Sequence, residues 1–270
     1  MNIKITGSGS YIPTEKVTNL DFAKHSFLNE DGSDFPYSNE VVAEKFLEIT
    51  GIEERRYVSD DLLASDIAVL AAQRAIDAAK IDPETLDYII FAHNFGNVKH
   101  GAIQADAVPS LASRVKQKLR IKNPYCVAYD MLFGCPGWIE GVILAQAYIK
   151  AGMAKKCLVI GAETLSRVVD IHDRDSMIYS DGAGATIIEA TEDEGGIISH
   201  ASATYATDEA DYLYFGNSFN KNLDEDVRYI KMHGRKIYEF ALNNVPNAMK
   251  LCLEKSGYKI TDVKKVLIHQ

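Results

Sequence analysis

Apolar and polar residues follow two periods along the chain, one typical of helices and the other of buried strands. Helix-like spacing marks residues 39–50 and 66–80, where apolar side chains recur every three or four positions. A continuous apolar run at 86–92 indicates a strand buried on both faces. Further helices and strands are then predicted in alternation at 106–118, 125–130, 136–150 and 157–162. This alternation predicts an α/β protein with a largely parallel sheet.

The end of the chain repeats part of this pattern. Residues 75–81 and 88–93, joined by a short turn, predict a helix and a strand that ends in a histidine. Residues 251–257 and 265–269 follow the same plan. A duplicated fold is one reading, and the general likeness of any two α/β units is the other. On the first reading the second copy stops at its strand, and an unfinished sheet core would expose a large apolar face.

Residues 173–226 lie between the two predicted sets of helices and strands and are rich in Asp, Tyr, Asn and Ser. Within them, residues 179–186 contain closely spaced small residues and predict a tight turn that feeds a strand, since their glycines lack the spacing of a phosphate-binding loop. Residues 206–226 have the composition of a mobile surface loop.

Composition limits the classes of protein to which the chain can belong. Its 270 residues, 47% of them hydrophobic, are enough to bury a full core. A net charge of −9 argues against unaided nucleic-acid binding, and no apolar run approaches the roughly 20 residues of a membrane span. The four cysteines are scattered and the N-terminus lacks a secretory apolar core, so we expect reduced thiols and a cytoplasmic location.

Among the four cysteines, Cys135 has the most unusual surroundings. It lies between Gly134 and Pro136, after a predicted strand and directly before a predicted helix. Proline favours the first position of a helix, so the thiol is expected near the free N–H groups of a helix N-terminus, which favour a thiolate. The other three cysteines lie in apolar stretches. Cys135 is therefore the candidate nucleophile, although position alone leaves an ordinary structural thiol equally open.

A partner imidazole would help such a thiol, because a helix N-terminus stabilises a nearby anion by only roughly 0.3–1 kcal/mol. Among the seven histidines, His269 follows the apolar run Val266-Leu267-Ile268, which predicts a strand. Catalytic groups collect at the carboxyl ends of strands in parallel sheets. His269 is thus a candidate partner, and an ordinary histidine at a strand end is the alternative.

The segment around Cys135, residues 131–142, resembles the nucleophile motif of β-ketoacyl-acyl carrier protein synthase III, one of the condensing enzymes with the thiolase fold. Other segments resemble the same family in the same order. They are residues 7–13, 50–56, 181–185 and 232–234, and the terminal His269-Gln270, which matches the start of a His-Gln-Ala-Asn motif. The resemblance covers the whole chain, and the ordered set is far more specific than any single segment.

This resemblance implies a thiolase-like fold of two similar βαβαβ-type halves. Residues 1–190 would form the first half with the nucleophile, and residues 191–270 the start of a second half that is incomplete. Cys135 would take an acyl starter from acyl-CoA or from an acyl carrier protein. Malonyl-acyl carrier protein would then lose CO2 and attack the acyl-enzyme to give a 3-oxoacyl product in fatty acid or related lipid synthesis. His269 would hydrogen-bond the malonyl thioester oxygen as enolate charge develops.

The same resemblance implies further site residues and partners. Thr50 and Arg167 stand where the family contacts CoA, Gly234 belongs to a matching segment, and Trp138 replaces the phenylalanine that the family usually has, so we expect it to reshape the acyl pocket. Acyl carrier protein, acyl-CoA and a second copy of the chain in a homodimer are the implied partners. No metal or redox cofactor is implied. The family's catalytic Asn would lie beyond Gln270, so we expect the 270-residue chain to be inactive or incompletely folded.

Other classes of protein share some of these features. A papain-like protease also has a cysteine far upstream of a histidine, but its Cys-Gly-Ser-Cys-Trp signature is absent. A degradative thiolase or a hydroxymethylglutaryl-type synthase would share the fold. A non-catalytic partner subunit is a further alternative, and the presence of both Cys135 and His269 argues against it.

Overall fold

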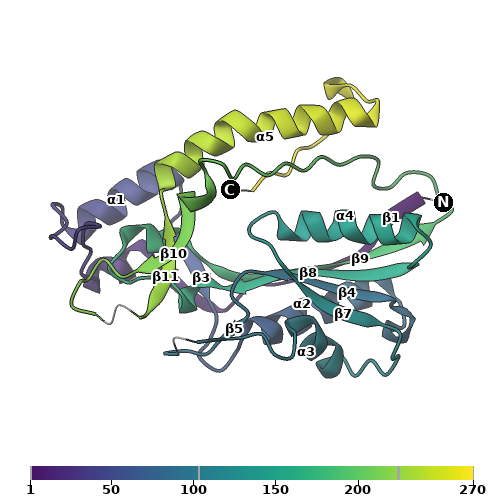
Figure 1. Ribbon diagram of the computed structural model, residues 1–270, viewed down its shortest axis with the longest axis horizontal. Coiled ribbons are helices and arrows are strands. Elements are labelled where there is room, and N and C mark those ends of the chain that lie inside the picture. Colours follow the sequence, from purple (N-terminus) through teal and green to yellow (C-terminus); the bar gives the residue numbers. More distant parts are fainter. Residues whose placement is uncertain (1, 103, 224–225, 270) are drawn as a thin grey trace.

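A computed structural model describes residues 2–102, 104–223 and 226–269, and its centre is a five-stranded sheet in the order β1-β9-β8-β4-β7 (Figure 1). β7, β4 and β8 run parallel to one another, whereas β9 runs antiparallel to both β8 and β1. β9 alone therefore opposes the common direction of this sheet, and the prediction of a largely parallel α/β sheet is confirmed. The strands are β1 (Asn2–Tyr11), β4 (Tyr88–His93), β7 (Val127–Leu132), β8 (Lys156–Thr164) and β9 (Asp181–Thr191).

Helices cover both faces of this sheet (Figure 1). α2 (Ala64–Ala79) and α3 (Leu111–Lys118) pack on one face, and α4 (Gly137–Lys150) packs on the other. Side chains alternate between the two faces along each strand, so Ile89 of β4 joins the apolar cluster under α2 and Ile90 joins the cluster under α4. Burial on both faces explains the continuous apolar run of β4.

α2 approaches β1 closely because small residues line the contact. A Cβ atom added to Gly7 would lie 2.3 Å from Ala75 O, and one added to Gly9 would lie 2.3 Å from Ala71 O. Neither position of the strand can carry a larger residue unless the helix moves away.

Short elements surround the sheet. β2 (Glu15–Thr18) pairs with β3 (Glu54–Tyr57), and β5 (Asn97–Val98) pairs with β6 (Ala105–Asp106). Helix α1 spans Asn39–Thr50. The short 3-10 helices are η1 (Asn19–Lys24), η2 (Pro83–Thr85), η3 (Leu165–Arg167), η4 (Arg174–Ile178), η5 (Ala210–Tyr212) and η6 (Ile260–Asp262).

The helix predicted over 106–118 begins later, at Leu111. Pro109 disfavours helical geometry in the residue before it. Ser110 then caps the helix, because its Oγ accepts a hydrogen bond from Ser113 N at 3.1 Å. The predicted start of the helix is therefore wrong by five residues, and its predicted end at residue 118 is confirmed.

The turn predicted over residues 179–186 is also corrected, because most of this segment lies in strand β9. Gly182 and Gly184 pair with β8 on one side, and Gly184 also pairs with β1 on the other. The backbone groups that a turn would leave to solvent are here satisfied by a ladder to neighbouring strands.

A hairpin follows β9 in the chain. Its strands are β10 (Leu213–Asn217) and β11 (Arg228–Met232), and they pair antiparallel. The surface loop predicted over 206–226 is therefore wrong for the residues that form η5 and β10. Residues 224 and 225 of that prediction lie outside the described residues.

A buried ionic cluster fastens the hairpin to the segment that follows β8. Lys231 Nζ lies 2.5 Å from Asp170 Oδ2 and 3.2 Å from Asp173 Oδ2, and all three residues are buried. The ammonium group also lies 3.5 Å from the ring centroid of Phe219. Two carboxylates and an aromatic face thus compensate one buried cation.

α5 (Gly234–Ser256) lies above α4 in Figure 1, with an extended segment between the two helices. Ser199 of that segment donates a hydrogen bond from Oγ to Cys252 O at 2.8 Å. No described residue of α5 is buried. An exposed apolar stripe runs along the helix and consists of Tyr238, Leu242, Val245 and Met249. No helix in the described part of the chain is long and apolar enough to cross a membrane.

The strand predicted at Val266-Leu267-Ile268 is wrong, because residues 263–269 form no strand and are exposed. A strand needs a neighbour for its backbone hydrogen bonds, and none of the described strands pairs with this segment. The second series of the repeat therefore has its helix and its turn but not its strand. The division into residues 1–190 and 191–270 stays a prediction.

Candidate active site

The carboxyl ends of β8, β4 and β7 lie side by side, and Cys135 follows the last of them by three residues. Phe133 N donates a hydrogen bond to His93 O at 3.2 Å, which continues the ladder between β4 and β7 beyond the end of β7. Gly137 N then donates to Gly134 O at 2.7 Å and closes a turn around Cys135. The nucleophile candidate is thus carried by a short turn between a sheet edge and a helix.

The Cys135 side chain is exposed, whereas Cys126 and Cys157 are buried and Cys252 is intermediate. α4 begins at Gly137 with Pro136 as its N-cap, so the helix starts one residue later than the sequence predicts. No described residue accepts a hydrogen bond from the Cys135 backbone N–H. A thiol and a free N–H at the start of a helix can together attack a carbonyl carbon and stabilise its oxyanion.

Two glycines of α4 fix the helix against the sheet and therefore fix the Cys135 turn. A Cβ added to Gly137 would lie 2.8 Å from Ala92 Cβ, and one added to Gly141 would lie 2.7 Å from Val159 Cγ1. The first turn of α4 consequently rests directly on β4 and β8.

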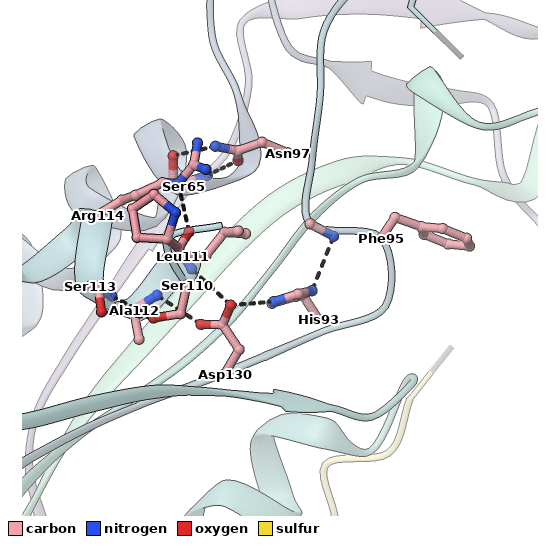
Figure 2. A network of polar contacts seen from close by, with 12 residues as sticks. Ser65, His93, Phe95, Asn97, Ser110, Leu111, Ala112, Ser113, Arg114 and Asp130 are labelled. Atoms are coloured by element: carbon pink, nitrogen blue, oxygen red, sulfur yellow. Dashed lines mark hydrogen bonds and ion pairs between the residues drawn. The ribbon is translucent and has the colours of Figure 1, made fainter. Parts of the chain in front are cut away.

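A polar network lies behind the turn and joins three elements (Figure 2). His93 Nε2 lies 3.0 Å from Asp130 Oδ2, and Asp130 accepts hydrogen bonds from the N–H groups of Leu111 at 2.7 Å and Ala112 at 2.8 Å. Gly96 N donates to His93 Nδ1 at 3.1 Å, so the imidazole proton is on Nε2, the ring nitrogen that lies beside Asp130. The Asp130 carboxylate therefore holds the ends of β4 and β7 to the first turn of α3.

Sequence reasoning missed three polar residues: His93, which is buried, and Asp130 and Glu163, which are half-buried. Each is the final or nearly final residue of an apolar strand, and that position was the available signal. Burial raises the pKa of the Glu163 carboxyl to about 7, against hydrogen bonds from Phe95 and Asn94 that lower it. Glu163 Oε2 is buried and accepts no hydrogen bond from a described residue.

Tyr179 is a further polar side chain near the thiol; the residue is half-buried, and its hydroxyl oxygen is buried. Burial raises the pKa of its phenol well above the usual value, and the charges of Asp175, Asp173 and Cys135 add to that effect. Its hydroxyl forms no hydrogen bond within the described part of the chain. The side chain packs with Phe95 in a small apolar cluster beside the strand ends.

Arg167 of η3 lines a cavity of about 350 Å³ on the same side of the sheet as the strand ends. Its guanidinium donates to Ser59 O at 2.8 Å and lies 3.3 Å from Asp60 Oδ1, so it is already bound to the segment after β3. Aromatic, aliphatic and basic residues form the rest of the wall, among them Phe95, Val98, His100, Phe215, Arg228 and Tyr229.

The other predicted substrate contacts lie in different places. Thr50 ends α1, and its Oγ donates to Phe46 O at 2.6 Å. Gly234 begins α5, where an added Cβ would lie 3.4 Å from Asp175 Oδ2. The substrate-binding roles of Thr50, Gly234 and Arg167 stay predictions.

Trp138 packs between α4 and the sheet. Its Nε1 donates a hydrogen bond to Thr186 Oγ1 at 3.0 Å in β9, and its ring contacts the apolar cluster that contains Ile90 and Val142. The expected effect of this residue on the acyl pocket stays a prediction.

His269 is exposed in the extended segment after η6, and it forms no hydrogen bond or ion pair with the described residues. The structure does not bring its imidazole into contact with Cys135. Gln270, the other residue of the matching pair, lies outside the described residues. The pairing of His269 with Cys135 therefore stays a prediction.

Comparisons with known proteins agree with this geometry. The family model for 3-oxoacyl-[acyl-carrier-protein (ACP)] synthase III matches residues 129–206, which include the Cys135 turn. The β-ketoacyl-[acyl-carrier-protein] synthase III of Neisseria meningitidis serogroup C is 35% identical over 271 residues, which cover 99% of this chain and 76% of that protein. The protein of the same name from Erythrobacter litoralis is 33% identical, with coverage of 98% and 76%.

Solved structures show the same likeness. The crystal structure of 3-oxoacyl-[acyl-carrier-protein] synthase III from Aquifex aeolicus superposes with a TM-score of 0.78 at 31% identity, covering 97% of this chain and 74% of that one. The Thermus thermophilus synthase III gives a TM-score of 0.77 at 29% identity, with coverage of 96% and 74%. The fold is thus the thiolase-like fold of condensing acyltransferases. The chain belongs to the β-ketoacyl-[acyl-carrier-protein] synthase III family, as the resemblance of its motifs implies.

Proposed function

We propose that the protein catalyses a decarboxylative Claisen condensation with Cys135 as the acyl-accepting nucleophile. The expectation that the 270-residue chain by itself is inactive or incompletely folded stays a prediction, and the acylation test below checks it. The thiolate attacks the carbonyl carbon of an acyl thioester, and the carrier thiol leaves. Malonyl-acyl carrier protein then binds and loses CO2, and the resulting carbanion attacks the Cys135 thioester. The products are a 3-oxoacyl-acyl carrier protein and the free Cys135 thiol, and the reaction starts fatty acid or related lipid synthesis.

One observation carries this proposal: in a chain of this family, Cys135 is the exposed thiol that lies between the parallel strand ends and the start of a helix. Its backbone N–H has no acceptor among the described residues and is available to the oxyanion of the acyl-transfer step. A preorganised donor of this kind contributes roughly 10²–10³ in rate in other acyl-transfer enzymes.

We propose that His269 serves the second step by donating a hydrogen bond to the malonyl thioester oxygen. The exposure of its side chain leaves the imidazole available to a substrate. These steps use a thiol, an imidazole and thioesters, so no metal or redox cofactor is part of the proposal.

The cavity beside Arg167 is the proposed binding place of the acyl donor. Its aromatic and aliphatic wall suits an acyl chain, while Arg167 and Arg228 suit the phosphate groups of CoA or of a carrier-protein arm. Thr50 and Gly234 are proposed as further contacts. Because these substrates are cytoplasmic metabolites, we propose the cytoplasm as the location of the protein.

A homodimer is proposed through β7, which is an edge strand of the sheet. Exposed apolar residues lie at both ends of this edge, including Tyr125 at 84%, Val127 at 47% and Leu132 at 76%. An uncovered edge with exposed apolar side chains favours pairing with a second strand. Sedimentation of the wild type and of Val127→Asp tests this point, and we expect the variant to sediment as a monomer.

The activity is tested by intact-mass analysis after incubation with a panel of acyl-CoAs and acyl carrier proteins. We expect one acyl adduct, mapped to Cys135 and absent from Cys135→Ala, with His269→Ala still acylated. Malonyl-acyl carrier protein should then discharge the wild-type adduct but not the adduct of His269→Ala. A wild-type chain that takes no acyl group would instead support a non-catalytic partner subunit.

A further inference from the structure

His93, the last residue of β4, makes polar contacts with three parts of the chain, and the proposed reaction gives it no role (Figure 2). Its backbone carbonyl accepts a hydrogen bond from Phe133 N at 3.2 Å. In its ring, Nδ1 accepts a hydrogen bond from Gly96 N at 3.1 Å, and Nε2 lies 3.0 Å from Asp130 Oδ2. The side chain is only 5% exposed, so water competes little for these contacts.

The contact with Asp130 leads to the turn that carries the nucleophile. Asp130 is itself fixed by hydrogen bonds from two N–H groups at the start of α3. From Asp130 the chain runs through the end of β7 to Phe133, whose N–H donates to the His93 carbonyl. One residue of β4 therefore holds this stretch at two points, through its ring and through its backbone. Cys135 follows two residues after the second point, so a shift of the imidazole would reach the thiol through a short stretch of backbone.

The contact with Gly96 shapes the wall of the proposed donor cavity. The hydrogen bond from Gly96 N to the ring closes a turn over residues 93–96, in which Gly96 has a left-handed backbone with a φ of 69°. Phe95 lies inside this turn. Its side chain lines the cavity and packs on Phe215, with 5.3 Å between the ring centroids. The imidazole thus sets the place of an aromatic ring that the acyl donor is proposed to meet.

We propose that His93 is a positioning residue for both sides of acyl transfer, the nucleophile and the donor. Its Nε2 holds the end of β7 and with it the Cys135 turn. Its Nδ1 holds the 93–96 turn and with it the Phe95 wall of the cavity. This inference rests on the proposed function and adds to it the residue that places the thiol and the donor relative to each other. A misplacement of about 1 Å can cost about 10²-fold in rate.

Two substitutions separate the two ring nitrogens, because an amide side chain can replace one of them at a time. His93→Gln places an amide nitrogen near the position of Nε2, so it can still donate to Asp130 but offers Gly96 N no acceptor. His93→Asn is shorter and places an amide oxygen near the position of Nδ1, so it can still accept from Gly96 N but does not reach Asp130. His93→Phe keeps a ring and loses both contacts.

The test measures single-turnover acyl transfer to Cys135 over a range of donor concentrations. The donor is the acyl-CoA or acyl carrier protein that gives the adduct in the panel above. Each rate is divided by the final amount of adduct, so chains that fail to fold do not alter it. His172→Gln and His172→Asn are the matched controls, since His172 also uses both ring nitrogens: Nδ1 lies 2.8 Å from Ser26 O, and Nε2 lies 3.3 Å from Asn220 Nδ2.

We expect His93→Gln to raise the half-saturating donor concentration about fivefold and to leave the saturated rate unchanged. His93→Asn should lower the saturated rate by roughly 10–10²-fold and leave the half-saturating concentration unchanged. His93→Phe should show both changes. Phe95→Leu, which removes no buried polar group, should reproduce the change of His93→Gln. Both His172 variants should behave as the wild type.

A histidine that only stabilises the fold would give a different result. It would change the yield of adduct and neither kinetic quantity, or it would change both quantities alike in His93→Gln and His93→Asn. Either outcome would overturn the proposal, and so would a Phe95→Leu chain with the wild-type half-saturating concentration.

Each variant can overturn the proposal alone, through a slower saturated rate in His93→Gln or a higher half-saturating concentration in His93→Asn. The failure of one variant to fold therefore leaves the test intact. A wild-type adduct with unaffected His93 variants refutes this inference alone. The absence of any adduct in the wild type refutes the proposed function, and this inference with it.

Discussion

His93 Nε2 lies 3.0 Å from Asp130 Oδ2, and this contact ties the last residue of β4 to the strand that leads into the Cys135 turn. The same carboxylate accepts hydrogen bonds from two N–H groups at the start of α3. One side chain therefore sets the positions of two strands and a helix behind the proposed nucleophile.

Replacing Asp130 should weaken the fold. Asp130→Asn loses the charge at the start of α3 and leaves an N–H group facing donors, so we expect the free energy of unfolding at pH 7 to fall by about 2–3 kcal/mol. Urea unfolding measures this change. Asp106→Asn is the control, because Asp106 is an exposed carboxylate paired with Arg114 and such pairs contribute little.

The contribution of Asp130 to the free energy of unfolding should also depend on pH. Burial opposes its charge, but the hydrogen bonds from His93 and from the amides of Ala112 and Leu111 outweigh burial and hold its pKa below the usual value. A carboxylate of this kind contributes stability above the unfolded pKa of about 3.9, and the contribution is lost as pH falls through the lower folded value. The gap between wild type and Asp130→Asn should therefore close under acid conditions. If the difference in free energy of unfolding between wild type and Asp130→Asn stayed constant into the acid range, the lowered pKa of Asp130 would be contradicted.

Lys231 should be required for docking of the β10–β11 hairpin. Lys231→Met leaves the buried carboxylates of Asp170 and Asp173 without their cation, a loss that typically costs about 3–5 kcal/mol. We expect faster hydrogen exchange in β10 and β11, while the exchange of β4 and β8 stays slow. Lys250→Met, at an exposed position of α5, is the control. Unchanged exchange in the hairpin of Lys231→Met would show that the cluster does not hold it.

Gly137 should be necessary for placing Cys135. Gly137→Ala puts a methyl group 2.8 Å from Ala92 Cβ, so α4 must shift away from β4 and carry the turn with it. We expect acyl transfer to Cys135 to slow by about 10²-fold. Gly184→Ala is a matched control, since an added Cβ there meets nothing within 4 Å. Equal rates in the two variants would mean that the turn is held independently of this contact.

The sequence predicted the structure best where the residues within a single helix or strand determine it. The run 86–92 predicted a buried strand, and Pro136 predicted a helix start beside Cys135; both are confirmed, the second with a shift of one residue. The family motifs added the thiolase-like fold, which the comparisons show directly.

The parts that escaped prediction depend on neighbours that are remote in sequence. His93, Asp130 and Glu163 form a site only because the order β8-β4-β7 brings three strand ends together, and no local pattern encodes that order. Residues 265–269 have the apolar pattern of a strand, but no described strand pairs with them. Local patterns thus predicted elements well, and failed where pairing decides the outcome.

Peptide mapping of the acylated chain identifies the acyl-accepting residue, which we propose to be Cys135. Wild-type protein is incubated with the acyl-donor panel, digested and analysed by mass spectrometry beside Cys135→Ala. We expect a single acyl group on the peptide that contains Cys135, with Cys126, Cys157 and Cys252 unmodified. An adduct on another cysteine, or an equal adduct in Cys135→Ala, would contradict it.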